Sequence, residues 1–186
     1  MSWDVRTFAA ESYAAASAAV IGSALPAEGR VVITGGGTAE QVYGELATAG
    51  AGWSGIDVFF SDERCVPPDH PASNFGMAQR TLLGSVRPRS VHRMEGERPP
   101  AEAARSYDGR VRAVDGFDLV LLGLGDDAHV AGLFPGSPAL TSSARCVDVE
   151  RPDGMRGVTL TPPALLSARS VVFVVTGASK AAAVAR

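Results

Sequence analysis

Short apolar runs rich in β-branched residues alternate along the chain with longer segments whose apolar positions recur every three or four residues. The runs predict strands, and the longer segments predict helices. The expected strands are residues 30–34, 55–60, 118–125, 158–161 and 170–177. The expected helices are residues 5–25, 39–50, 73–84, 99–114 and 162–168, with another beginning at 179. This alternation predicts the α/β class, with an open, mostly parallel sheet and helices on both faces in a Rossmann-like three-layer arrangement.

Residues at the ends of these segments support the same division of the chain. Ser73 is placed to cap the helix that follows it, and Gly84 is placed to end that helix. Segment 135–157 is rich in proline and glycine and is the least regular, with room for short strands. The chain stops at Arg186, inside a predicted helix. We therefore expect residues 1–186 to form one α/β domain that lacks its C-terminal tail.

Composition narrows the setting in which this domain works. The 186 residues carry a formal net charge of −3, which gives no reason to expect a nucleic acid or an anionic membrane surface as partner. The N-terminus lacks a signal-peptide pattern, and no apolar run approaches the roughly 18 residues that span a bilayer. Cys65 and Cys146 are isolated, which disfavours a disulfide framework or a zinc site. We expect a cytoplasmic protein that binds a small molecule, as a monomer or weak homo-oligomer.

Polar segments follow four of the predicted strands. They are residues 35–38 (GGGT), 61–64 (SDER), 125–129 (GDDAH) and 176–180 (TGASK). Because the carboxyl ends of parallel strands meet at one edge of a sheet, we expect these segments to form one ligand site there.

Several side chains in these segments suit a phosphorylated ligand. The amides of Gly36, Gly37 and Thr38 precede a helix, where an anion is favoured. Arg64 suits bidentate phosphate binding, and Asp62 suits sugar hydroxyls. Lys180 is the only lysine of the chain, and a lysine in the first turn of a helix opposes the helix dipole unless an anion binds there.

Two simpler or different interpretations of the glycine segment stay open at this point. It can be a tight turn without a ligand. It can also serve a dinucleotide, because Asp62 ends the second strand, where a ribose partner is expected. The segment fits neither the nucleotide P-loop pattern nor GxGxxG.

His129 is the candidate catalytic residue. Asp127 and Asp126 precede it, and nearby carboxylates favour the protonated imidazole, which suits a base that must accept a proton. No second histidine stands at metal-binding spacing, so a metal site is disfavoured.

These motifs, in this order, resemble the 6-phosphogluconolactonase family, which shares a superfamily with glucosamine-6-phosphate deaminase and ribose-5-phosphate isomerase. The resemblance is carried by TGGGTAEQVYGEL, FFSDERCVPPDHPASNFGMAQRTLL, LLGLGDDAHVAGLFPG, VTLTPPALLSA and VVFVVTGASKAAAV. It implies hydrolysis of 6-phospho-D-glucono-1,5-lactone in the oxidative pentose phosphate pathway, with no metal or organic cofactor. It also implies that His129 activates water, with Asp127 or Asp62 orienting the base or the sugar. The phosphate would be held by the Gly36–Thr38 amides, Arg64 and Lys180.

The chain departs from the family pattern at several positions. Gly37 replaces a usual serine, and Ala128 replaces the usual glycine before the histidine, so we expect that loop to bend differently. Gly157 replaces an arginine that usually precedes the VTLT strand, with Arg156 beside it. A deaminase would need an acid where this chain has Phe134, which disfavours deamination. A non-catalytic sugar-phosphate sensor is the other alternative.

Overall fold

A five-stranded parallel sheet forms the centre of the molecule. The computed structural model describes residues 4–50 and 52–185. The strands of this sheet are β1 (Gly29–Ile33), β2 (Ile56–Phe60), β4 (Ser90–His92), β5 (Phe117–Leu122) and β8 (Ala168–Phe173). Their order is β4-β2-β1-β5-β8, and every neighbouring pair is parallel. The predicted α/β class and mostly parallel sheet are confirmed.

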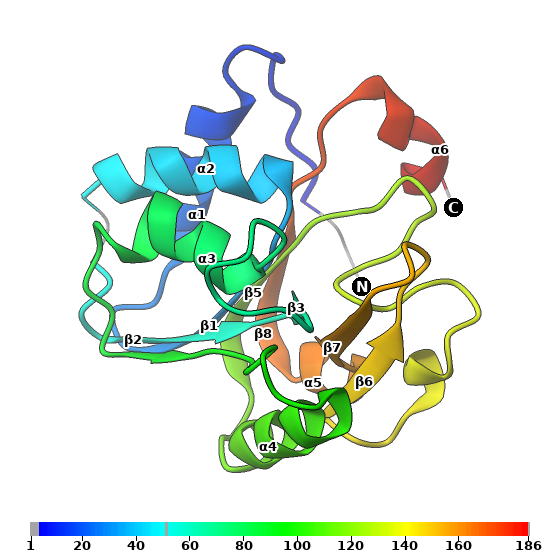
Figure 1. Ribbon diagram of the computed structural model, residues 1–186. Helices are drawn as coiled ribbons and strands as arrows, with labels where there is room; N and C mark the ends of the chain where they lie inside the picture. The colour runs from blue at the N-terminus through cyan, green and yellow to red at the C-terminus, as the bar shows by residue number, and fades with distance from the viewer. Residues whose placement is uncertain (1–3, 51, 186) are drawn as a thin grey trace.

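Helices cover both faces of this sheet (Figure 1). The helical elements of one face are α1 (Tyr13–Ala24), α2 (Gly37–Thr48), α3 (Asn74–Ala78) and the π-helical turn η1 (Gln79–Leu83). The other face is covered by α4 (Pro100–Arg112). Alternation along β1 supplies both layers, because Val31 and Ile33 pack on the α1–α3 side and Val32 packs on the α4 side.

A second, antiparallel sheet shares the α4 face. Its strands are β3 (Asp62–Arg64), β7 (Arg156–Leu160) and β6 (Cys146–Glu150), in the order β3-β7-β6. The sequence predicted residues 61–64 only as a loop, but pairing with β7 makes most of that segment a strand. The irregular segment 135–157 does contain a strand, β6.

The remaining elements are short. They are η2 (Pro138–Thr141), α5 (Pro162–Leu165), η3 (Ala178–Lys180) and α6 (Ala181–Val184). Across residues 4–50 and 52–185, none of the helices has the length and apolar character needed to cross a membrane.

Two expectations at the ends and edges of the fold were wrong, and one strand was not predicted. The opening helix begins at Tyr13 rather than at residue 5, because Val5 and Phe8 are exposed and give that stretch no buried face to stabilise a helix. β8 was expected to be buried, yet it is an edge strand with several exposed residues. β4 was missed, because its three residues include no buried one and so give no apolar run.

Two buried tyrosines fix the carboxyl ends of β1 and β2. The Tyr43 hydroxyl, on α2, accepts a hydrogen bond from the Thr34 amide at 2.9 Å and donates to the Thr34 carbonyl at 2.8 Å. The Tyr107 hydroxyl, on α4, accepts from the Phe60 amide at 2.7 Å. Backbone groups at the strand ends are thereby satisfied, and the polar segments that follow start from fixed points.

Glu63 is a buried carboxylate that joins β3 to α3. Its side chain is 3% exposed. One carboxylate oxygen accepts from the amides of Arg64 at 2.8 Å and Asn74 at 2.6 Å. The other accepts from the Ser73 hydroxyl at 3.0 Å and the Phe75 amide at 2.8 Å. Burial raises the pKa of Glu63, while these hydrogen bonds favour its ionised form.

The same contacts fix the beginning of α3. Ser73 caps this helix as predicted, because its hydroxyl accepts a hydrogen bond from the Gly76 amide at 3.0 Å. Since the Ser73 hydroxyl also donates to Glu63, strand and helix cap form one hydrogen-bonded unit.

We predict that Glu63→Gln lowers the free energy of unfolding by about 2–4 kcal/mol, because an amide NH₂ would face two buried donors and leave them unsatisfied. Denaturant unfolding followed by circular dichroism measures this change. Glu45→Gln, at an exposed position of α2, is the matched control and should change stability by less than about 0.5 kcal/mol. Equal stability of the two variants would show that Glu63 does not hold β3 and α3 together.

Candidate active site

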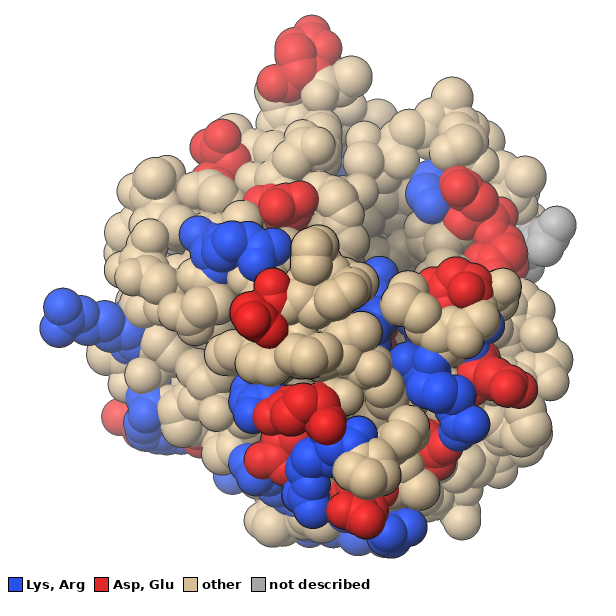
Figure 2. All heavy atoms as spheres, viewed as in Figure 1, with Lys and Arg blue, Asp and Glu red and all other residues tan. Residues whose placement is uncertain are grey.

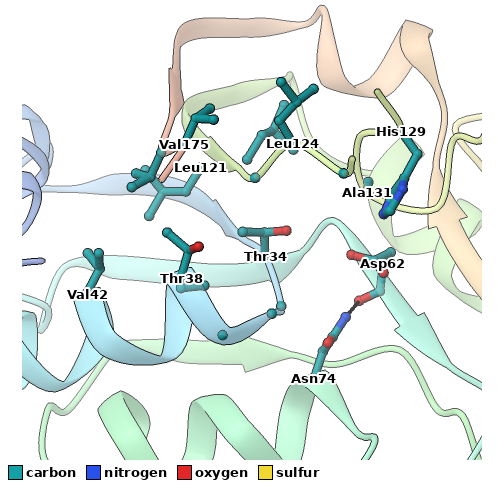
Figure 3. A pocket seen from close by; sticks show the side chains of 18 of the residues that line it. Thr34, Thr38, Val42, Asp62, Asn74, Leu121, Leu124, His129, Ala131 and Val175 are labelled. Carbon is teal, nitrogen blue, oxygen red and sulfur yellow. Dashed lines mark hydrogen bonds between the residues drawn. The ribbon is translucent and has the colours of Figure 1, made fainter. Parts of the chain in front are cut away.

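A cavity lies where the strand order reverses. From β1 the chain proceeds to β2, and from β5 it proceeds to β8 on the other side, so the loops leaving β1 and β5 diverge. The cavity between them has a volume of about 220 Å³. All four predicted polar segments contribute to its walls, so the prediction that they meet at one edge is confirmed. Figure 3 shows Thr38, Asp62 and His129 around it, coming from three of these segments.

Most of the predicted site residues line this cavity. They are Gly36, Gly37, Thr38, Asp62, Arg64, His129 and Lys180. Asp127 does not line it but contacts His129. Two further residues, Arg151 and Asn74, line the cavity although no sequence pattern singled them out.

The glycine segment presents the amino end of α2 to the cavity. Gly36 precedes the helix with φ of 101°, a left-handed value that favours glycine. The first amides of α2, from Gly37 onward, have no partner within the helix and are available to an anion. Gly35 has a different role, because a Cβ atom there would overlap the side chain of Asn74.

Strand β3 presents Asp62 and Arg64 on one side and Glu63 on the other, because side chains alternate along a strand. The Asp62 side chain is 8% exposed and accepts a hydrogen bond from the Ser61 hydroxyl at 2.9 Å. Arg64 Nη1 donates to the Asn74 side chain, whose amide nitrogen donates in turn to the Asp62 carbonyl at 2.9 Å. Arg64 Nε is buried and has no partner within the described chain.

His129 is held by Asp127, two residues before it. The Asp127 carboxylate oxygen lies 2.6 Å from His129 Nδ1 and accepts from the His129 amide at 3.1 Å. An ionised carboxylate only accepts, so Nδ1 carries the proton and Nε2 is the free nitrogen. Burial of Asp127 opposes its ionisation, but the hydrogen bonds and charge of His129 lower its pKa overall. The ring projects toward Asp62 across the cavity (Figure 3).

Ala128 adopts the conformation that glycine would favour. Its φ is 70°, and that of Ala131 is 54°, the two positive values at non-glycine residues within the described chain. We expected the alanine to make the loop bend differently. In this chain the alanine itself adopts a left-handed conformation and carries the strain.

Lys180 lines the cavity but is paired with an acid. Its Nζ atom lies 2.9 Å from Asp126 Oδ1, in the loop after β5. Hydrogen bonds from Lys180 and Ser179, with the charge of Lys180, hold the pKa of Asp126 below its usual range. Lys180 ends η3 and precedes α6, so it does not lie in the first turn of the last helix as predicted.

Arg151 reaches the cavity from the turn between β6 and β7. Its side chain is 9% exposed, with Nη1 3.8 Å from Asp62 Oδ2. Its Cζ atom lies 5.3 Å from the centroid of the Phe134 ring. Arg156, the arginine that the sequence places beside Gly157, does not line the cavity and forms an ion pair with Asp148. No sequence signal distinguishes Arg151, which lies in the segment without periodicity.

On the face that Figure 2 shows, the charged side chains outside the cavity do not gather into a patch of one sign. Figure 2 shows acidic and basic side chains interspersed over the visible face. Among residues 4–50 and 52–185, no group of three or more histidine, cysteine, aspartate or glutamate side chains is arranged to hold a metal ion.

The chain is similar to sugar-phosphate enzymes over nearly its whole length. The family described as glucosamine-6-phosphate isomerases/6-phosphogluconolactonase matches residues 5–186. A 6-phosphogluconolactonase from Synechocystis is 40% identical over 164 residues, which cover 82% of this chain and 68% of that protein. The structure of 6-phosphogluconolactonase from Thermotoga maritima is 29% identical with a TM-score of 0.86, covering 94% of this chain and 84% of that one.

Fold alone does not choose between the activities of this superfamily. A monomeric glucosamine-6-phosphate deaminase also has a TM-score of 0.86, at 19% identity, over 97% of this chain and 85% of its own. At that identity only the shared fold follows. The choice therefore depends on the side chains around His129.

We predict that Ala128→Gly raises the free energy of unfolding by about 1 kcal/mol, because relief of the left-handed strain exceeds the entropy that glycine adds to the unfolded chain. Thermal or denaturant unfolding measures the change. The matched control, Ala19→Gly at an exposed position within α1, should lower stability by about 1 kcal/mol. Destabilisation of similar size by both substitutions would contradict a strained loop.

Proposed function

Because this chain belongs to the glucosamine-6-phosphate isomerase/6-phosphogluconolactonase family, we propose that it hydrolyses 6-phospho-D-glucono-1,5-lactone to 6-phosphogluconate. The observation that carries this proposal is the arrangement around His129. Asp127 fixes the ring through Nδ1, and Phe134 packs against it with ring centroids 4.6 Å apart. A base is held in place, and an apolar ring occupies the position at which the deaminase pattern has an acid.

In the proposed reaction, His129 acts as a general base. Nε2 takes a proton from water while the water oxygen attacks the C1 carbonyl of the lactone. Asp127 keeps the ring in the required tautomer and stabilises the imidazolium that forms. When the tetrahedral intermediate collapses, the bond from C1 to the ring oxygen breaks, and that oxygen takes the proton back from His129.

The substrate phosphate binds at the other end of the cavity. The amides of Gly36, Gly37 and Thr38 face it from the amino end of α2. Arg64 supplies a guanidinium whose buried Nε lacks a partner in the described chain, and an acceptor oxygen from the ligand would satisfy it. When the substrate binds, Lys180 leaves its ion pair with Asp126 and pairs with the phosphate instead.

Asp62 holds sugar hydroxyls rather than orienting His129, since Asp127 already makes the contact to Nδ1. This route uses only side chains and amides of the chain itself. We place the enzyme in the cytoplasm, where the free thiols of Cys65 and Cys146 stay reduced.

We predict that His129→Ala lowers kcat by about 10²–10⁴-fold while KM changes little, because the base is lost and the phosphate contacts remain. The assay follows hydrolysis of freshly generated lactone, corrected for its spontaneous opening. His70→Ala, at an exposed position on another loop, is the control and should keep the rate of the unmodified protein.

Two results would count against this proposal. An unchanged kcat in His129→Ala would remove His129 as the base. An unmodified protein that binds 6-phosphogluconate but gives no rate above background would favour the sugar-phosphate sensor.

We predict opposite effects for the two partners of the Lys180–Asp126 ion pair. Lys180→Ala should raise KM about 10–100-fold, since a charge-assisted hydrogen bond to phosphate contributes about 1.5–3 kcal/mol. Asp126→Ala should lower KM, because Lys180 is then free before the substrate arrives. Steady-state kinetics of both variants at one ionic strength test this. A rise of KM in both would mean that the pair supports the loop instead of competing with phosphate.

A further inference from the structure

The reacting end of the cavity contains a cation to which the proposed reaction has so far given no role. The cavity is lined by three arginine or lysine side chains, Arg64, Arg151 and Lys180. Arg64 contacts Asn74, which adjoins the glycine segment, and Lys180 contacts Asp126. Arg151 is the one of the three within 4 Å of Asp62. Figure 3 shows His129 projecting toward Asp62. The guanidinium that lies 3.8 Å from the Asp62 carboxylate therefore belongs to the end where the base acts.

We infer that Arg151 is a catalytic residue that donates hydrogen bonds to the C1 oxygen of the lactone and stabilises the oxyanion formed there. This inference rests on the proposed lactone hydrolysis. The hydrolysis of an ester passes through a tetrahedral oxyanion, and donors fixed at that oxygen are among the largest contributions to catalysis.

The Arg151 guanidinium has N–H donors that are not used within the described chain. Nε donates to Asp153 Oδ2 at 3.3 Å. Nη1 is 3.8 Å from Asp62, which is close enough for charge attraction but too long for a hydrogen bond. No side chain or carbonyl of the described chain therefore accepts a hydrogen bond from either Nη group. Arginine stays protonated at any working pH, so these donors are present in the ground state and in the transition state.

One aromatic ring supports both Arg151 and His129. The Phe134 centroid lies 5.3 Å from Arg151 Cζ and 4.6 Å from the centroid of the His129 ring. A guanidinium placed over an aromatic face is attracted to it. The spacing of base and cation is therefore set by Phe134 before any ligand binds, which is the preorganisation that oxyanion stabilisation requires.

Gly157 provides the space that Arg151 occupies. A Cβ atom at position 157 would lie 3.1 Å from the Glu63 carbonyl oxygen and 3.2 Å from Cδ of Arg151. Gly157 is not among the glycines with a left-handed φ, so what glycine contributes there is reduced crowding of the arginine stem and not a turn. The arginine stem runs across this gap from the β6–β7 turn into the cavity.

The reaction step balances without another reactant. Water attacks C1, its proton passes to His129 Nε2, and the carbonyl electron pair moves to the oxygen that Arg151 contacts. The carbonyl then re-forms, the bond from C1 to the ring oxygen breaks, and the ring oxygen takes the proton from His129. Arg151 remains a cation throughout and transfers no proton.

The test compares Arg151→Ala and Arg151→Lys with Arg156→Ala in the full chain. Arg156 lies on the same hairpin, is exposed and pairs with Asp148, so it is the matched control. We expect Arg151→Ala to lower kcat about 10²–10³-fold with KM changed less than about threefold. Arg151→Lys should recover part of the rate, and added guanidinium ion at millimolar concentration should partly rescue Arg151→Ala. Arg156→Ala should stay within about twofold of the unmodified protein.

Each other outcome overturns the inference. A rise in KM at constant kcat would make Arg151 a phosphate ligand. If Arg151→Lys lost as much kcat as Arg151→Ala, and guanidinium did not rescue Arg151→Ala, Arg151 would have only a structural role. Melting temperature and titration with 6-phosphogluconate show whether each variant folds and binds. If Arg151→Ala does not fold because Asp62 has lost its counter-charge, Arg151→Lys and its kcat alone decide. Absence of lactone hydrolysis by the unmodified protein would instead contradict the proposed function itself.

Discussion

The candidate site depends on one buried carboxylate, that of Glu63. Its two oxygens accept four hydrogen bonds that bind strand β3 to the first residues of α3. Because α3 lies on one face of the central sheet and β3 joins the small sheet on the other, this contact connects the two layers at the edge of the cavity. Because side chains alternate along a strand and Glu63 points into the protein interior, Asp62 and Arg64 point to the opposite side, toward the cavity. The buried acid Glu63 thus positions two residues of the candidate site, Asp62 and Arg64.

The topology supplies the second constraint. The loops after β1 and β5 diverge because the strand order reverses between these neighbours, and the cavity occupies the gap. Tyr43 holds the end of β1 where the glycine segment begins, while Asp127 holds His129 in the loop after β5. Each wall of the cavity is fixed by a contact made within its own neighbourhood, so the site is formed before a ligand arrives.

Sequence patterns predicted the elements that depend on neighbours along the chain. They failed for elements whose structure depends on pairing with a distant segment. Local apolar runs predict the strands at 30–34, 55–60 and 118–125. The polar segments after these strands lie together because parallel strands point in the same direction. The segment 61–64 becomes a strand only through β7, which nothing local reveals. For the same reason nothing in the sequence singled out Arg151, which enters the cavity from the β6–β7 turn, while Arg156, which the sequence places beside Gly157, does not line it.

The two ends of the cavity are built on different principles. At the end where we propose that the reaction occurs, His129 and Arg151 contact the same Phe134 ring, and Ala128 has a strained φ in the loop that carries His129. At the end where we propose that the phosphate binds, Lys180 forms an ion pair with the exposed Asp126, and such a pair in water exchanges partners at little cost. A rigid reacting end serves catalysis, because donors and base need no rearrangement during the reaction. An exchangeable cation serves binding, because a doubly charged phosphate can displace a single carboxylate from it. An uncharged sugar cannot do so.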